Sequence, residues 1–435
     1  MVATFAEQYY QISLILILAA FAIPISRKIA VADIPILIVL GILFGPALEI
    51  INHQFASDFL TQFGSIGIGL LGIMIILYYE SHYMNFRIIR RHFIRIASLD
   101  TIGVLITAVS AGFLFSLIFR APLSIGFLFG AIISPTDPAT LIPLFKRINV
   151  KEDVSGTLVG ESLFNDPIGI ILVSIAILLI APNASYISGF TGIVHNFGVI
   201  GGAIVYFIIQ VSIPAAIGIA VGFSVIILNR FLNFENLIVG LLLGIVILEF
   251  TALEATGITP FPAIIATGAI VGNFSDKSIF WNREASFQEN LSFLAQAVIF
   301  LSLGSMLTRT QLVDYALIGM AMTLLVLFVS RPAAVFVALL PMFRRDSRTI
   351  NAKTISFFSL VGPRGVVSVV MATVPYSVGI SSNNADLIKF GPTIAVVVSF
   401  IVLFSIVLQT IYLPYVSRKL VAQPEINNSN NESSQ

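Results

Sequence analysis

The sequence predicts an all-α polytopic membrane protein with about 13 transmembrane helices. Three observations support this fold class. Of the 435 residues, 57% are hydrophobic and only 10% are charged. Apolar runs of about 20 residues, the length that crosses a bilayer, recur from end to end. Lys and Arg gather in alternate loops between these runs, as they do in proteins that cross a membrane many times.

The apolar runs define the predicted helices and the extent of the domain. The helices lie near residues 9–25, 34–51, 60–79, 96–119, 122–145, 156–181, 199–229, 235–254, 261–274, 288–307, 314–342, 354–377 and 391–417. A single transmembrane domain therefore covers residues 1–421, and the polar residues 422–435 are predicted to be a disordered cytoplasmic tail. Residues 182–200 are expected to form an outer loop or surface segment, because another helix there would break the alternation of charged loops.

The distribution of positive charge predicts the orientation of the chain. Of the 23 Lys and Arg residues, 18 lie in the first loop, in every second loop after it and after the last helix. The opposite loops hold only Arg120, Arg309 and Lys389. Because positive residues stay on the cytoplasmic side, we expect the N-terminus outside and the C-terminus in the cytoplasm. The net charge of +1 does not indicate a nucleic-acid partner, and the absence of cysteine excludes thiolate metal sites.

Two predicted helices contain proline motifs that should interrupt them. The motifs are Ser-Pro-Thr-Asp-Pro at residues 134–138 and Gly-Pro-Arg-Gly at residues 362–365. Proline removes a backbone donor and clashes with the preceding turn, so each helix should break there. If residues 9–181 and 235–417 form two six-helix repeats around a linker helix at 199–229, both breaks fall in the fifth helix of a repeat. Paired breaks in inverted repeats are typical of transporters whose site lies where the breaks cross.

Three carboxylates, Asp137, Glu161 and Asp166, lie inside apolar runs near the first break. Ionised groups are costly in a membrane, so such residues are candidates for function. Thr136 and Asp137 could coordinate a hard cation, although Asp137 could also cap the second half-helix, and the two roles are compatible. Ser162 lies one helical turn before Asp166 and would add a ligand. The site offers only oxygen ligands, which favours an alkali cation over a transition metal.

The same acids suggest how a cation could be exchanged for a proton. Two carboxylates that lie close together in a low dielectric cannot both ionise cheaply, so at least one should carry a proton. An entering cation would restore the charged form and expel that proton. Competition for one site is then sufficient for exchange, without a separate path for protons.

Several other charged residues have more than one interpretation. Arg331, inside the eleventh span, needs an acidic partner, and we expect a structural pair with Glu161. Arg364 could compensate the carbonyl ends of the broken helix or extend to the cytoplasmic boundary. Glu80 ends the third span, either as a solvated acid or as a group that reaches the cation through water. Asp100 is expected to be a solvated acid at the start of the fourth span.

Two further features are expected to be structural. Glu249 and Glu254 bound the eighth span, where a solvated outer edge or a subunit contact is the favoured interpretation. Small residues in the third span, among them Gly69 and Gly72, should permit close helix packing. They could also line a surface on which helices slide, a hypothesis that bulky substitutions test.

Together these motifs resemble those of the NhaP-type sodium/proton antiporters, members of the monovalent cation/proton antiporter superfamily and relatives of the eukaryotic sodium/proton exchangers. Thr136-Asp137 is similar to the family's unwound-helix motif, and Asn165-Asp166 is similar to its Asn-Asp pair. Arg364 lies in an element that resembles the family's Gly-x-Arg-Gly, with a proline at the variable place. The resemblance extends over the full length of the chain.

The resemblance implies thirteen helices in inverted repeats, a homodimer in a prokaryotic cell membrane, and alternating access by elevator-like or rocking motion. Carried over by motif, Asp137, Asp166, Ser162 and Thr136 would bind Na⁺, and Glu80 would join them through water. Asn165 and Arg364 would support this site. Electrogenic relatives carry Asp-Asp where this chain has Asn165-Asp166, so the implied reaction is an electroneutral exchange of one Na⁺ or Li⁺ for one H⁺, without enzymatic chemistry or a cofactor.

Three alternatives remain. A K⁺/H⁺ antiporter would share the fold, because composition does not encode the sub-ångström cavity size that selects between Na⁺ and K⁺. A cation channel would share the ion site, but channels usually repeat one filter symmetrically, whereas two unlike breaks meet here. An intramembrane hydrolase could use Asp137 and Asp166 as an acid and a base, but no further catalytic motif supports it.

Overall fold

The computed structural model describes residues 2–29, 33–61, 68–137, 145, 150–182, 190–276, 279–345 and 351–421. Within these residues the prediction of an all-α protein is confirmed. Six of the described helical stretches are at least 18 residues long and apolar enough to cross a membrane, and shorter apolar helices lie between them. The predicted tail at 422–435 and the second half of the fifth predicted span lie outside the described residues.

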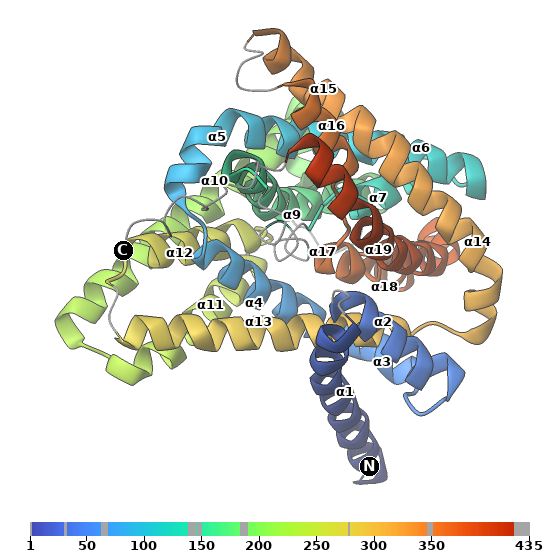
Figure 1. Ribbon diagram of the computed structural model, residues 1–435, viewed down its shortest axis with the longest axis horizontal. Helices are drawn as coiled ribbons and strands as arrows, with labels where there is room; N and C mark the ends of the chain where they lie inside the picture. Colours follow the sequence, from blue (N-terminus) through green and yellow to red (C-terminus); the bar gives the residue numbers. More distant parts are fainter. Residues whose placement is uncertain are drawn as a thin grey trace, which may run out of the picture.

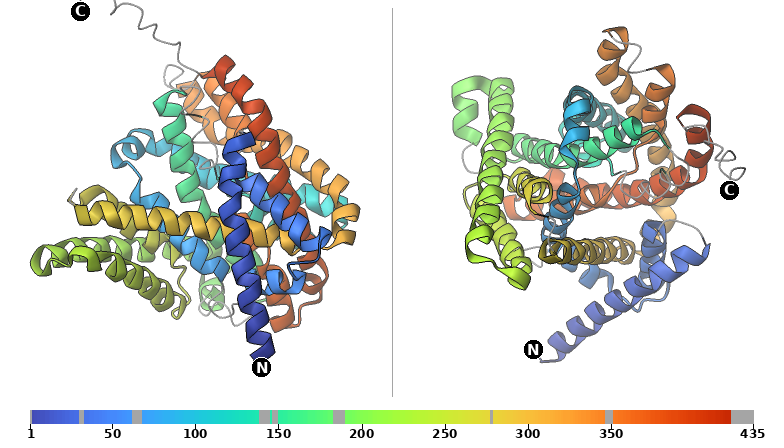
Figure 2. Two further views of the ribbon diagram at one scale, coloured as in Figure 1. Left: turned by 60° about the horizontal axis from the view of Figure 1, so that its bottom comes forward. Right: turned by 60° about the vertical axis from the view of Figure 1, so that its left-hand side comes forward.

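The helices form two bundles, each built from both halves of the chain. The flanking bundle comprises α1 (Val2–Ile29), α2 (Asp33–Ile42), α3 (His53–Thr61), α4 (Ile68–His82), α10 (Phe190–Leu232), α11 (Ile238–Glu254), α12 (Phe261–Phe274) and α13 (Ile279–Ser305). The site bundle comprises α5 (Phe86–Ser98), α6 (Val104–Phe119), α7 (Leu123–Ile133), α9 (Glu152–Ile180), α14 (Arg309–Leu325), α15 (Arg331–Arg345), α16 (Ala352–Leu360), α17 (Val366–Met371), α18 (Val374–Ser382) and α19 (Ala385–Leu420). In Figure 1, α13 lies across the lower part of the molecule, and Figure 2 shows α1 extending beyond the other helices at its N-terminal end.

Both predicted helix breaks are present, and both lie in the site bundle. After α7 ends at Ile133, residues 134–137 are not helical. Residues 361–365 separate α16 from α17 in the same way. Two glycines let α7 reach the interior, because a Cβ at Gly126 or Gly130 would overlap the backbone of α6. The first break is therefore held deep in the bundle.

The structure extends two predicted helices at their polar ends. α5 begins at Phe86, ten residues before the predicted fourth span, and Asn85 caps it by accepting a 2.9 Å hydrogen bond from the Arg87 N–H. α13 begins at Ile279 instead of residue 288. Both extensions are amphipathic, so a search for apolar runs misses them.

Three shorter features were not predicted. The helix α3 is too short and polar to resemble a transmembrane span. Residues 190–197, expected to be a loop or surface segment, are helical and join the rest of α10 at Gly198, whose φ of +70° a glycine adopts without strain. π-helical turns at Leu99–Gly103 and Val326–Ser330 join α5 to α6 and α14 to α15.

Candidate functional site

The two helix breaks cross and are joined by hydrogen bonds. The Asp137 N–H donates to the Pro363 carbonyl at 2.9 Å. From the other break, Nη1 of Arg364 donates to the carbonyls of Ser134 and Pro135 at 2.9 and 3.0 Å. These bonds satisfy backbone groups that the broken helices leave without partners.

Arg364 is 0% exposed, so its side chain does not extend to the cytoplasmic boundary, and that alternative is wrong. It compensates carbonyl ends, but those of the first break rather than of its own helix. The sequence could not show this, because the partner carbonyls lie 230 and 229 residues away along the chain.

Helix α9 lies against the first break and carries four of the predicted site residues. Nδ2 of Asn165 donates to Oγ1 of Thr136 at 2.8 Å, and both side chains are buried. Asn165 therefore orients the Thr136 hydroxyl. Ser162 and Asp166 are also buried, one helical turn apart on the same helix.

The expected ion pair between Glu161 and Arg331 is present. Both side chains are buried, and Nη1 and Nη2 of Arg331 each donate to one carboxylate oxygen of Glu161. Nε of Arg331 also donates to the Val361 carbonyl at 2.8 Å, where the second break begins. The pair thus connects α9 to α15 and to the second break, which is the geometry of a brace and not of a cation ligand.

Three carboxylates converge near the crossing. Asp137 and Asp166 are 8% and 7% exposed, and Glu80 is half-buried. Each of the three lies within electrostatic reach of another. Gly365 leaves room for one of them, because a Cβ there would lie 2.5 Å from Oδ2 of Asp137. Negative charge concentrated in a low dielectric favours a bound cation or bound protons.

A cavity of about 760 Å³ leads to this site from one side. Glu80, Ser162 and Gln296 line it, so Glu80 lies beside the site and not merely at a membrane boundary. The other charged residues that line it within the described part of the chain are acidic, namely Asp33, Glu152 and Glu289. A cavity with this lining attracts cations.

Two expectations for other acids are wrong. Asp100, expected to be solvated, is 1% exposed, because α5 begins upstream and places this residue within a continuous helical stretch. Glu249 is buried and accepts a 2.7 Å hydrogen bond from Oγ1 of Thr267. Glu254 is exposed, as expected for a solvated outer edge.

Two residues at the site were missed in the sequence. Ser405 and Gln409 of α19 contact the second break, through bonds from the backbone N–H groups of Arg364 and Gly362. Neutral polar residues are common in apolar helices and carry little signal by themselves. The break in the preceding helix was the available clue, because its free backbone groups require partners.

The comparisons agree with this arrangement of helices. Residues 14–419 match the family model described as "Sodium/hydrogen exchanger, transmembrane". The chain is similar to the Na⁺/H⁺ antiporter 1 of Methanocaldococcus jannaschii, with 32% identity over 380 residues that cover 86% of this chain and 84% of the relative. It is also similar to the probable Na⁺/H⁺ antiporter 2 of the same organism, with 30% identity and 81% of each chain covered.

A further relative is named for a different cation. The K⁺/H⁺ antiporter NhaP of Alkalimonas amylolytica is 28% identical over 387 residues, which cover 86% of this chain and 61% of that protein. Among solved structures, that of the sodium proton antiporter MjNhaP1 from Methanocaldococcus jannaschii superposes with a TM-score of 0.83 and 27% identity, covering 97% of this chain and 100% of that chain.

Proposed function

The chain belongs to the sodium/hydrogen exchanger family of transmembrane proteins, and on this premise we propose that it exchanges Na⁺ or Li⁺ for H⁺ across a membrane. One observation supports this function above the others. Asp137 and Asp166 lie at the crossing of two broken helices, and an acidic cavity leads there from one side. The named activity of the antiporter relatives agrees with this proposal.

The site residues divide into those that bind the cation and those that hold the binding groups in place. Asp137, Asp166, Ser162 and Thr136 supply carboxylate, hydroxyl and carbonyl oxygens for Na⁺, and Glu80 contributes through water. When the cation leaves, protons neutralise the carboxylates, because several negative charges cannot remain together in a low dielectric. Cation and proton thus compete for the same oxygen atoms, and the exchange requires no covalent step.

We propose that access to the site is open on the cavity side and closed on the other. Three polar residues lie at or beside the cavity, each on a different helix: Glu80 of α4, Asp166 of α9 and Gln296 of α13. An isoleucine lies about one turn further from the cavity on each of these helices, namely Ile76, Ile170 and Ile299.

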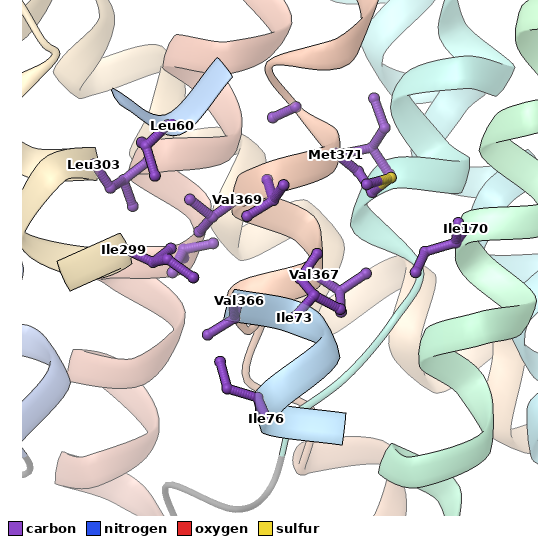
Figure 3. Close-up of a cluster of buried hydrophobic side chains, with 14 of the residues drawn as sticks. Leu60, Ile73, Ile76, Ile170, Ile299, Leu303, Val366, Val367, Val369 and Met371 are labelled. Carbon is purple, nitrogen blue, oxygen red and sulfur yellow. The ribbon is translucent and has the colours of Figure 1, made fainter. Parts of the chain in front are cut away.

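Figure 3 shows these three isoleucines packed with Val366, Val367 and Val369 of α17, between the two bundles. We call this cluster the apolar seal. It closes the side opposite the cavity, so transport requires the bundles to move relative to each other. Alternating access, elevator-like or rocking, provides that movement and distinguishes the protein from a channel.

The proposal includes an electroneutral stoichiometry of one cation for one proton, because Asn165 stands where a further carboxylate would add charge. It also includes a homodimer in a prokaryotic cell membrane, with the N-terminus outside and the C-terminus in the cytoplasm. The charge distribution of the loops supports this orientation. The second candidate function is exchange of K⁺ for H⁺. The test includes K⁺ because the chain is similar to a protein named as a K⁺/H⁺ antiporter.

The test is proton flux in reconstituted vesicles that contain a pH-sensitive dye. Na⁺, Li⁺ and K⁺ are added in turn to the wild type and to Asp166→Asn. We expect Na⁺ and Li⁺ to change the internal pH through the wild type and not through the variant. A response to K⁺ alone would replace the cation in the proposal, and no response from folded wild-type protein to any cation would contradict antiport.

A further inference from the structure

The second break does not satisfy its own backbone groups, and α19 supplies their partners. Oε1 of Gln409 accepts from the Gly362 N–H at 3.0 Å, and Oγ of Ser405 accepts from the Arg364 N–H at 3.2 Å. One turn beyond Gln409, the Tyr412 hydroxyl donates to the Leu360 carbonyl at 2.6 Å. Residues spaced by four and three positions share one face of a helix. We call these three side chains the α19 ladder.

The ladder lies where water cannot replace it. Ser405 and Gln409 are fully buried, and Tyr412 is half-buried. A buried backbone N–H without a partner is energetically costly, so we expect the break to rearrange when one ladder side chain is lost.

The segment that the ladder holds makes the hydrogen bonds that join the two breaks. Pro363, which accepts from the Asp137 N–H, lies between the two residues whose N–H groups the ladder binds. Arg364, which donates to the carbonyls of the first break, is itself bound by Ser405. The position of the first break therefore depends on α19, although α19 carries none of the proposed cation ligands.

The arrangement parallels that of α9. A side-chain amide holds each break, that of Asn165 on α9 and that of Gln409 on α19. Ser162 and Asp166 on α9 have the same four-residue spacing as Ser405 and Gln409 on α19. In the predicted repeats these are the two sixth helices, so the two Ser-containing pairs lie on corresponding helices.

We propose that Ser405 and Gln409 are positioning residues of the ion site, which act through residues 361–365 on Thr136 and Asp137. The inference rests on the proposed cation binding at that site. Because a cation site depends on sub-ångström placement of its oxygens, relaxing the second break weakens cation affinity more than it weakens the fold.

The test compares Gln409→Leu with wild type by Na⁺ titration of thermal unfolding, since a ligand that binds the folded state raises the melting temperature. We expect the apparent Kd for Na⁺ to rise about tenfold, which corresponds to about 1.4 kcal/mol. Ser405→Ala removes the weaker contact, and we expect a rise of about threefold. Gln409→Glu keeps an acceptor oxygen for Gly362 and should restore most of the affinity.

The matched control is Thr410→Val on the same helix. The Thr410 hydroxyl donates within its own helix, to the Ile406 carbonyl at 2.8 Å, so this variant should bind Na⁺ as the wild type does. If Gln409→Leu and Ser405→Ala lower the melting temperature without changing the apparent Kd, the ladder is merely structural and the inference is wrong. If Gln409→Leu does not fold, Ser405→Ala decides alone. If Na⁺ does not stabilise the wild type, the proposed site fails first.

Discussion

At the scale of residues, the side chains that hold the two breaks differ from the carboxyl groups that we propose as cation ligands. Arg331, Arg364 and Asn165 each donate to protein atoms, namely a carboxylate, two carbonyls and a hydroxyl. Asp137 and Asp166 instead place two carboxyl groups at the crossing, within electrostatic reach of each other. In the exchange that we propose, this division is useful because the bonds that hold the breaks persist when the cation leaves.

The Glu161–Arg331 pair gives the first prediction. Removing one partner leaves an unpaired buried charge, so Glu161→Met or Arg331→Met alone should lower the free energy of unfolding by about 3–5 kcal/mol. The double variant Glu161→Met with Arg331→Met removes both charges and should lose less than the sum of the single changes. Thermal unfolding of all four proteins in one detergent measures this coupling. Additive losses would show that the two side chains do not act as a pair.

Asn165 gives the second prediction. Asn165→Asp replaces the amide that donates to Thr136, and an ionised carboxylate cannot donate, so the apparent affinity for Na⁺ should fall about tenfold. The added acid does not by itself create a second proton site in the cycle. We therefore expect no transport current when a voltage is applied to reconstituted vesicles. A current from the wild type would contradict electroneutral exchange, and a current from the variant alone would show that Asn165 sets the stoichiometry.

At the scale of elements, the sequence predicted the breaks because proline and glycine act locally. The same reasoning failed at Asp100, because the start of a helix depends on polar turns such as those of α5 that hydropathy does not record. It also failed at Glu249, whose partner Thr267 lies on another helix, α12, of the same bundle. Local chemistry was therefore readable from the sequence. Among contacts between helices, the Glu161–Arg331 pair was predicted because a buried charge requires a partner, whereas the Glu249–Thr267 bond was not.

Helix α4 gives the third prediction, which tests the sliding surface. A Cβ at Gly69 would lie 2.9 Å from Cγ1 of Val370, on α17 of the other bundle, and 2.9 Å from the Leu60 carbonyl oxygen, on α3 of its own bundle. Gly69→Val should therefore obstruct relative motion and slow Na⁺-dependent proton flux at least about tenfold, while Na⁺ binding is retained. Gly244→Val on α11, where nothing lies within 4 Å of an added Cβ, is the matched control. If Gly69→Val leaves Na⁺-dependent proton flux unchanged, the hypothesis that helices slide along this surface is wrong.

At the scale of the whole molecule, the two bundles meet differently on the two sides of the site. Within the described residues, four acidic side chains lie among mostly apolar residues in the lining of the cavity. The apolar seal, about one helical turn further along the same helices, instead consists of isoleucine and valine. Hydropathy alone could not separate the seal from other apolar contacts, because its residues come from distant parts of the chain (Figure 3). In the alternating access that we propose, the opposite end of the transport cycle must open the seal and close the cavity.

The absence of cysteine from the sequence makes this cycle measurable with single introduced thiols. Ser155 lines the cavity, and Ile299 lies in the seal, where it is 0% exposed. The two single variants are therefore Ser155→Cys and Ile299→Cys. A membrane-impermeant thiol reagent should label position 155 from the cavity side at once. Position 299 should stay unlabelled from either side at rest and become reactive from the opposite side only during turnover, with Na⁺ and a pH gradient present. Because a channel opens both sides together, labelling of position 299 from the cavity side would favour a pore. Labelling from the opposite side alone, and only during exchange, requires the bundles to alternate.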